Sequence, residues 1–214
     1  MIRQRMRIRF GKQDDLRWIG HRDLLRVLER LLRRARLKLS MTEGFHPKPR
    51  LSFPLALAVG ISADEEVMEL ELAEAMEPDQ LLAVLNEHTV PGLTFHSVEK
   101  AVIGEKKAQV ESVVFEIPVP VADQPRVRAA IADFLAAESH LVEREKRVEP
   151  VDIRRDVMRL ELGDEGLEMQ LRTARDASVR PREVLAVLGL AELEYDGYLL
   201  RRSTVNLTNE KVTP

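Results

Sequence analysis

The first ten residues constrain the fold of this chain more than any other segment, because arginine occupies every second position from Arg3 to Arg9. Apolar residues lie between them in the alternate register, at Ile2, Met6, Ile8 and Phe10. Side chains of a β-strand point alternately to the two faces of a sheet, so this period of two predicts a strand over residues 2–10. One face of that strand is expected to be buried, and the other to carry a row of guanidinium groups.

Apolar periodicity predicts five further elements in the first half of the chain. A leucine stripe with helical spacing predicts a helix from about His21 to Leu37, and the apolar run Leu51–Val59 is typical of a central strand buried on both faces. The other predicted elements are the helix Asp79–His88, which follows Pro78, and the strands Val67–Leu72 and Leu93–Val98. The resulting order, β-α-β-β-α-β, is the ferredoxin-like arrangement.

The second half nearly repeats this order of elements without repeating the residues. The polar segment Gly104–Gln109 predicts a linker. After it we expect a strand Val113–Val119, a helix over residues 125–138, an edge strand His140–Val148, a hairpin of Val157–Leu162 and Leu167–Leu171, a helix from Pro181 to Gly189 and a strand Tyr195–Val205. The prediction is an α+β fold of two tandem ferredoxin-like domains, residues 1–103 and 110–214.

The absence of cysteine limits the chemistry open to this chain of 214 residues. Without thiolates it cannot hold an iron–sulfur cluster or a disulfide framework, and the composition suits a reducing cytoplasm. The five histidines lack metal-binding spacings such as HExxH, and no glycine-rich phosphate loop is present. The arginine-rich start does not match a signal peptide, and no apolar run approaches the roughly 18 residues of a membrane helix. We expect a cytoplasmic protein with no metal, no other cofactor and no membrane partner.

Charge is distributed unevenly along the chain, although the net charge is only −3. Residues 1–50 contain 15 Lys and Arg against 5 Asp and Glu, whereas residues 51–214 contain 18 against 31. Such segregation indicates that the basic segment contacts nucleic acid. The alternative is that the acidic remainder folds against the basic segment and neutralises it.

Two features of the basic segment are candidates for binding RNA phosphates. On the predicted helix, spacings of four, four and three place Arg22, Arg26, Arg30 and Arg33 on one face, where each guanidinium can donate two hydrogen bonds to a phosphate. The segment "GFHPKPR", residues 44–50 and called the elbow below, adds Lys48 and Arg50 on a backbone restricted by two prolines. We predict that helix and elbow form one groove. The alternatives are a solvated helix face and a loop stiffened only to enter the next strand.

Two histidines leave a catalytic alternative open. His21 begins the predicted helix, and His46 lies in the elbow beside Lys48 and Arg50. A metal-independent ribonuclease needs a base for the 2′-hydroxyl and cations for the phosphate, which these residues could supply if they met in space. A histidine that caps a helix or contacts a phosphate is the other interpretation, so no residue is assigned a catalytic role beyond these two candidates.

The runs "RIRFGKQDDLRWIGHRDLLRVLERLLRRA" and "EGFHPKPRLSFPLALAVGISADEE" resemble the start of the bacterial radical-SAM-linked protein family, an uncharacterised group. Its elbow has the form Gly-Phe-(Asn/His)-Pro-(Lys/Arg)-Pro, and "SVRPREVLAVLGL" resembles its second recurring motif. Gly11 and Gly20 stand where the family more often has serine. The resemblance implies association with a radical S-adenosylmethionine (SAM) enzyme. The leading hypothesis is therefore a non-catalytic RNA-binding or substrate-presenting module that acts with such an enzyme. The alternatives are the ribonuclease and a structural adaptor that binds an acidic protein.

Overall fold

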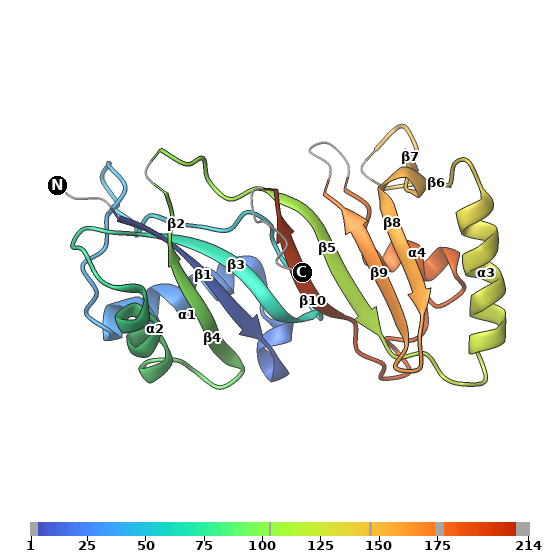
Figure 1. Ribbon diagram of the computed structural model, residues 1–214, viewed down its shortest axis with the longest axis horizontal. Coiled ribbons are helices and arrows are strands. Elements are labelled where there is room, and N and C mark those ends of the chain that lie inside the picture. Colours follow the sequence, from blue (N-terminus) through green and yellow to red (C-terminus); the bar gives the residue numbers. More distant parts are fainter. Residues whose placement is uncertain (1–3, 103, 146, 174–177, 209–214) are drawn as a thin grey trace. The chain divides into compact units, whose positions relative to one another are not determined.

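The computed structural model describes residues 4–102, 104–145, 147–173 and 178–208, and it has a mixed α/β architecture. The described residues divide into two compact units, drawn from blue to red along the chain in Figure 1. The first unit runs through Gln109 and also includes Thr208, and the second is Val110–Leu207. No helix in the described ranges is long and apolar enough to cross a membrane.

The first unit is an antiparallel sheet with two helices. Strand β1 pairs with β4 on one side and with β3 on the other, and the short β2 pairs with β3. In chain order the elements are β1 (Gln4–Lys12), the 3-10 helix η1 (Asp14–Trp18), α1 (His21–Arg34), β2 (Leu51–Ser52), β3 (Ser62–Leu72), α2 (Pro78–Glu87) and β4 (Leu93–Lys100). The predicted positions of β1, both helices and β4 are confirmed to within a few residues, whereas Ile2 and Arg3 lie outside the described residues.

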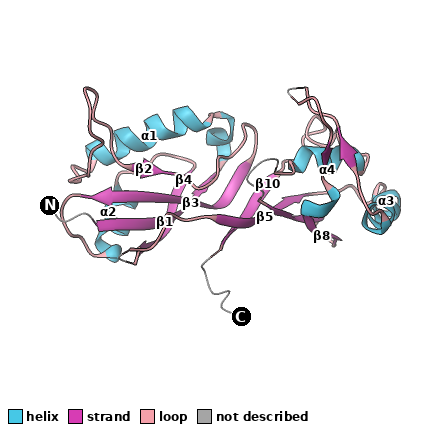
Figure 2. Ribbon diagram, turned by 90° about the horizontal axis from the view of Figure 1, so that it is seen from above, coloured by secondary structure: helices cyan, strands magenta, loops and turns pink. Residues whose placement is uncertain are grey.

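One face of this sheet and both helices share a single core. Met6, Ile8 and Phe10 of β1 are fully buried, as the period of two predicts. They lie in one hydrophobic cluster with residues of α1 and α2, and Figure 2 shows α1 extending along this face. The helical members of the cluster are Leu24, Leu28, Leu31, Leu32, Leu81 and Leu85. The arginines of β1 therefore belong to the opposite face.

The prediction of a central strand over Leu51–Val59 is wrong. Only Leu51 and Ser52 pair with β3, and the chain then leaves the sheet at Pro54, which has no N–H to donate to a ladder. Phe53 instead packs edge-on against Phe10, with ring centroids 6.0 Å apart, and Val59 is half exposed. Beyond Ser52 the apolar run is a loop, and Leu51 and Phe53 pack against the hydrophobic cluster. A loop of this kind has the same composition as a buried strand, so the run alone did not distinguish them.

The second unit is also an antiparallel sheet with two helices. Strand β5 pairs with β10 and β9, and β9 pairs with β8. The elements are β5 (Val110–Ile117), α3 (Gln124–Ala136), β6 (Leu141–Val142), β7 (Val151–Asp152), the 3-10 helix η2 (Arg154–Asp156), β8 (Val157–Leu162), β9 (Leu167–Arg172), α4 (Pro181–Val187) and β10 (Arg201–Leu207). The predicted hairpin corresponds to β8 and β9 and is confirmed.

Two strand predictions in this unit extend too far. The expected edge strand His140–Val148 is reduced to Leu141–Val142, which pairs with β7 rather than with the main sheet. Its remaining residues are mostly charged and offer little apolar surface to bury. The expected strand Tyr195–Val205 begins only at Arg201, because the chain before it turns at Gly197, whose φ is 91°.

Candidate functional site

Helix α1 ends in a basic turn that directs the chain toward the elbow. The four predicted arginines of this helix, Arg22, Arg26, Arg30 and Arg33, are all exposed, since its leucines occupy the buried side. The helix stops at Arg34, and Arg36 then has a φ of 53°. This left-handed backbone occurs at the position after the helix cap, where glycine is favoured, and it costs a side-chain-bearing residue about 1 kcal/mol.

The elbow is one arm and the tip of a hairpin formed by residues 40–50. Thr42 N donates to Lys48 O and Arg50 N donates to Ser40 O, both at 2.8 Å, while Thr42 Oγ1 accepts from Lys48 N at 3.0 Å. The hairpin is joined to β3, because Ser40 N donates to Glu71 O at 2.8 Å. In Figure 1 it is the light-blue loop beside the N-terminal label. Backbone hydrogen bonds therefore hold the elbow in place at the edge of the sheet.

A pocket of about 530 Å³ lies between the end of α1 and this hairpin; we call it the elbow pocket. The pocket is lined by basic and apolar residues and by one carboxylate, that of Glu29. The basic lining residues are Arg33, Arg36, Lys38 and Lys48, and the apolar ones are Leu32, Leu37, Leu39, Met41, Pro47 and Pro49. Of the six residues predicted to form one groove, Arg33 and Lys48 line this pocket, whereas Arg22, Arg26, Arg30 and Arg50 do not.

The four basic side chains of the elbow pocket have no ion-pair or hydrogen-bond partner in the part of the chain that the structure describes. Neighbouring cations differ in this respect: Arg26 is 2.8 Å from Asp23, and Arg34 donates to the carbonyl oxygen of His88 at 2.6 Å. Four like charges around one concave surface create a positive potential that attracts anions. The elbow pocket is therefore suited to bind a group with several negatively charged oxygens.

Arg50 lies away from the elbow pocket. Its Nε donates to the carbonyl oxygen of Met41 at 3.0 Å and is 3.9 Å from Glu71 Oε2. It lines a second pocket, of about 140 Å³, with Arg5, Lys107 and two glutamates. Because carboxylates offset the cations there, this second pocket is a weaker candidate for an anion than the elbow pocket.

The two candidate catalytic histidines occupy different parts of the first unit. His21 is the first residue of α1, and its ring packs edge-on against Phe53 at a centroid distance of 5.1 Å. His46 is exposed in the elbow, which adjoins the other end of this helix. A helix of 14 residues is about 21 Å long. The structure does not bring the two imidazoles together, and neither lines the elbow pocket.

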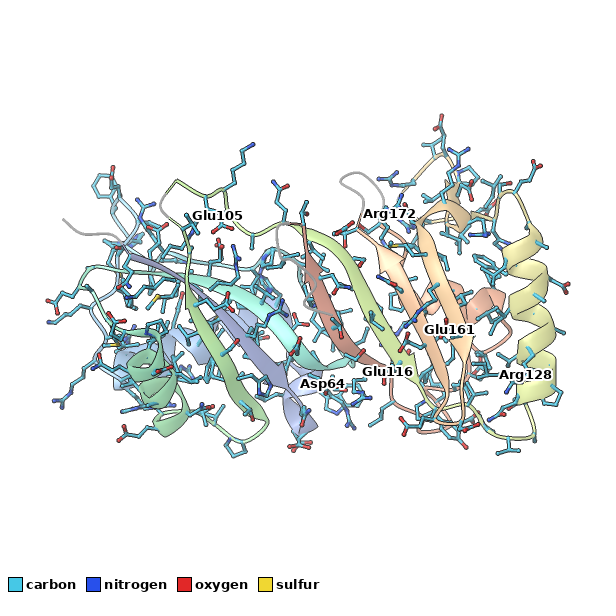
Figure 3. All side chains as sticks on the ribbon, in the orientation of Figure 1. Asp64, Glu105, Glu116, Arg128, Glu161 and Arg172 are labelled. Atoms are coloured by element: carbon cyan, nitrogen blue, oxygen red, sulfur yellow. The ribbon has the colours of Figure 1, made fainter. Side chains whose placement is uncertain are left out.

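The arginines of β1 are neutralised, as the alternative interpretation of the charge distribution expects. Arg9 is 3.2 Å from Glu65, and Arg7 is 3.4 Å from the buried Glu69. The predicted linker packs over the same face, since Glu105 Oε1 accepts from Arg7 Nη2 at 3.0 Å; Figure 3 labels Glu105 on the loop after β4. The row of guanidinium groups is thus a set of internal ion pairs, and it offers less to an outside anion than the elbow pocket does.

The Arg7–Glu105 pair shifts the pKa of both groups. The hydrogen bond from Arg7 is the main cause that lowers the pKa of Glu105, and a hydrogen bond from Val102 N acts in the same direction. Burial by itself would lower the pKa of Arg7, but the hydrogen bonds and charges of Glu105 and Glu69 outweigh it and raise that pKa. Ionised Glu105 therefore stabilises the folded first unit.

We expect Glu105→Gln to lower the melting temperature at neutral pH, and the difference from the wild type to shrink in acid. The folded pKa of Glu105 lies below the ordinary value of 4.5, so its contribution is complete above that value and is lost as the pH falls through the folded pKa. Thermal melting of both proteins between pH 7 and pH 3 measures this difference. In an Arg7→Gln background the effect should largely vanish, and a difference independent of pH would contradict the assignment.

Three residues at this site were not among the predicted site residues. Arg36 and Lys38 follow the predicted arginine stripe, but the direction of their side chains depends on the left-handed backbone at Arg36. Glycine or asparagine usually marks such a backbone turn in a sequence, and neither is present here. Phe45 is fully exposed at the tip of the hairpin, although an aromatic residue is usually expected to be buried. The run of basic residues after the predicted stripe is the sequence signal for the first two. No sequence signal distinguished Phe45 from a core residue.

Comparison with known proteins places the chain in a family. No curated protein matches it. A family model described as "Uncharacterized protein conserved in bacteria (DUF2344)" matches residues 5–181. This range contains α1, the elbow and every residue that lines the elbow pocket, and it ends at the first residue of α4. Since the match spans most of the 214 residues, the chain belongs to this family of conserved bacterial proteins.

Proposed function

We propose that this protein binds RNA and that the elbow pocket holds phosphate groups of the RNA backbone. The observation that carries the proposal is the set of four basic side chains around this pocket without a partner in the described ranges. Guanidinium and ammonium groups bind phosphate through charge-assisted hydrogen bonds, and backbone contacts of this kind dominate the affinity for nucleic acids.

An extended polyanion fits the surroundings of the pocket better than a single small anion. The pocket opens beside the exposed face of α1, where Arg30 and Arg22 continue the row of cations from Arg33. A nucleic acid places phosphates at regular intervals and can contact several such positions at once. The apolar walls formed by Met41, Pro47 and Pro49 add surface against which a sugar or base can pack.

The function is proposed to be non-catalytic, with the chemistry supplied by a separate radical SAM enzyme in the cytoplasm. The likeness of the helix start and the elbow to the radical-SAM-linked family supports this partner. This chain contains no cysteine, so thiolate ligands for an iron–sulfur cluster would come from the partner. In this proposal the protein presents RNA, or another phosphate-bearing substrate, to that enzyme.

We also infer that each unit is a ferredoxin-like domain, so that the chain is a tandem pair. The support is the order of strands: β4-β1-β3-β2 in the first unit and β10-β5-β9-β8 in the second, with all neighbouring pairs antiparallel. Along the chain, α1 precedes and α2 follows the pair β2 and β3 in the first unit. In the second unit α3 precedes and α4 follows the pair β8 and β9. Sheets of this type frequently serve as RNA-binding platforms, which is compatible with the proposed function.

The substitution Arg36→Gly tests the proposed function with little risk to the fold. Glycine relieves the left-handed strain at this position, so we expect the free energy of unfolding to stay equal or rise by up to about 1 kcal/mol. Loss of one phosphate contact should lower the affinity about fivefold at about 0.1 M salt and reduce the slope of log K on log salt by about 0.7. Fluorescence anisotropy with a labelled RNA hairpin measures affinity, and urea unfolding measures stability.

The matched control is Arg172→Ala, which removes an exposed arginine of β9 in the second unit that does not line the pocket. It should change affinity less than Arg36→Gly does. An unchanged affinity in Arg36→Gly, or an RNA affinity of the wild type that does not depend on salt, would contradict the proposal.

A further inference from the structure

We propose that the RNA bound by this protein is single-stranded at the site and that an unpaired base stacks on Phe45. This inference rests on the proposed function and names the substrate class that the elbow pocket recognises. It is carried by an aromatic ring at the tip of a braced hairpin, beside a group of cations that have no partner in the described residues.

The exposure of Phe45 is complete, and its position is held by the hairpin. An isolated exposed apolar residue is common on protein surfaces and needs no explanation. Here the tip is fixed by the hydrogen bonds between Thr42 and Lys48, by the turn at Gly44, whose φ is 126°, and by Pro47. A ring on such a tip loses little conformational freedom on binding, which favours a role in recognition.

The spacing of Phe45 and Lys48 along the hairpin suits a short stretch of nucleic acid. Phe45 precedes Lys48 by three residues, so their backbones are at most about 10 Å apart. Lys48 lines the elbow pocket together with Pro47, and exposed Met41 on the facing arm of the hairpin also lines it. A phosphate at Lys48 therefore leaves the neighbouring base within reach of Phe45. His46, exposed next to it, offers a second ring for the following base.

Stacking on a protruding ring selects unpaired bases. In a duplex each base is covered by its neighbours, and A-form RNA exposes mainly phosphates and 2′-hydroxyl groups. The phenylalanine side chain has no hydrogen-bonding group. Stacking on it therefore distinguishes single-stranded from double-stranded RNA but does not distinguish one base sequence from another. The cations hold the backbone of either form, and Phe45 adds affinity only for the single strand.

The test compares two RNAs of equal length, an unstructured single strand containing 2-aminopurine and a blunt-ended duplex. We expect Phe45→Ala to lower the affinity for the single strand about tenfold and to leave the affinity for the duplex unchanged. Phe45→Tyr, which keeps the ring, should retain single-strand affinity. In the wild type the emission of 2-aminopurine should change on binding, and this change should be lost in Phe45→Ala.

The outcomes separate this inference from the proposed function. If Phe45→Ala leaves both affinities unchanged or lowers both equally, while Arg36→Gly still weakens binding, the phosphate site stands and the stacking is overturned. If the wild type binds neither RNA at low salt, both proposals fail. If Phe45→Ala abolishes binding to phosphatidylserine vesicles but not to the single strand, the ring serves a lipid surface and the inference is wrong.

Discussion

Replacing Glu69 by alanine is expected to destabilise the first unit by about 3–5 kcal/mol, the range observed when one member of a buried ion pair is removed. Glu69 is only 3% exposed, and its Oε1 lies 3.4 Å from Arg7 Nη2 and 3.9 Å from Arg5 Nε. The same oxygen accepts a hydrogen bond from Ala108 N at 3.1 Å. Alanine would leave the guanidinium groups of Arg5 and Arg7 without this counter-charge, and would remove the hydrogen bond to Ala108 N.

Urea unfolding followed by the fluorescence of Trp18 measures this change, because the single tryptophan lies in the first unit and contacts Arg17. Glu65→Ala is the matched control: it also removes a glutamate of β3 that pairs with an arginine of β1, but its side chain is 44% exposed. Exposed pairs contribute about 0–1 kcal/mol, so this variant should stay close to the wild type. Equal effects of the two substitutions would show that burial does not determine the strength of these pairs.

The double substitution Arg33→Ala and Lys48→Ala removes one cation on the helix side of the elbow pocket and one on the hairpin side. We expect it to weaken RNA binding about 25-fold at about 0.1 M salt. This variant would lose two phosphate contacts, each of which contributes about 0.7 to the slope of log K on log salt. The slope itself should fall by about 1.4. Both side chains lack partners in the described residues, so the melting temperature should change little.

The control for this variant combines Arg22→Ala and Arg30→Ala, which removes the same charge from the exposed face of α1 outside the pocket. A salt titration of all three proteins with the labelled RNA hairpin compares them directly. If the two double variants lose the same affinity, then the whole helix face binds RNA without a defined pocket. If neither loses affinity, the basic segment has another role.

The helices and most strands of both units could be predicted because they depend on local patterns. Met6, Ile8 and Phe10 alternate with arginines, and a strand is the backbone form that separates them. The leucines of α1 recur at helical spacing, and only a helix gathers them on one side. The prediction failed where composition is ambiguous, as in Leu51–Val59, which is apolar but does not pair as a strand beyond Ser52.

The candidate site could be predicted only in part, since it joins segments by tertiary contacts. Arg33 and Lys48 were predicted to share a groove, and both line the elbow pocket. Arg50 has the same local sequence context as Lys48, but its side chain lies 3.9 Å from Glu71 and lines the second pocket, a placement that the local sequence does not indicate. His21 and His46 were considered together only because a ribonuclease needs groups of this kind. In the structure His21 begins α1, whereas His46 lies in the elbow beside the other end of that helix.

The sequence by itself determined the excess of positive charge near the N-terminus and the elements that carry it. Only the tertiary structure decided which of those charges are available to an outside anion. The arginines of β1 meet Glu65, Glu69 and Glu105, which come from distant parts of the chain, so their charge is neutralised within the first unit. The cations around the elbow pocket meet no such partner among the described residues. The physical reason is that a charge is offset by whatever lies within a few ångströms in the folded chain, and separation along the sequence does not fix that distance.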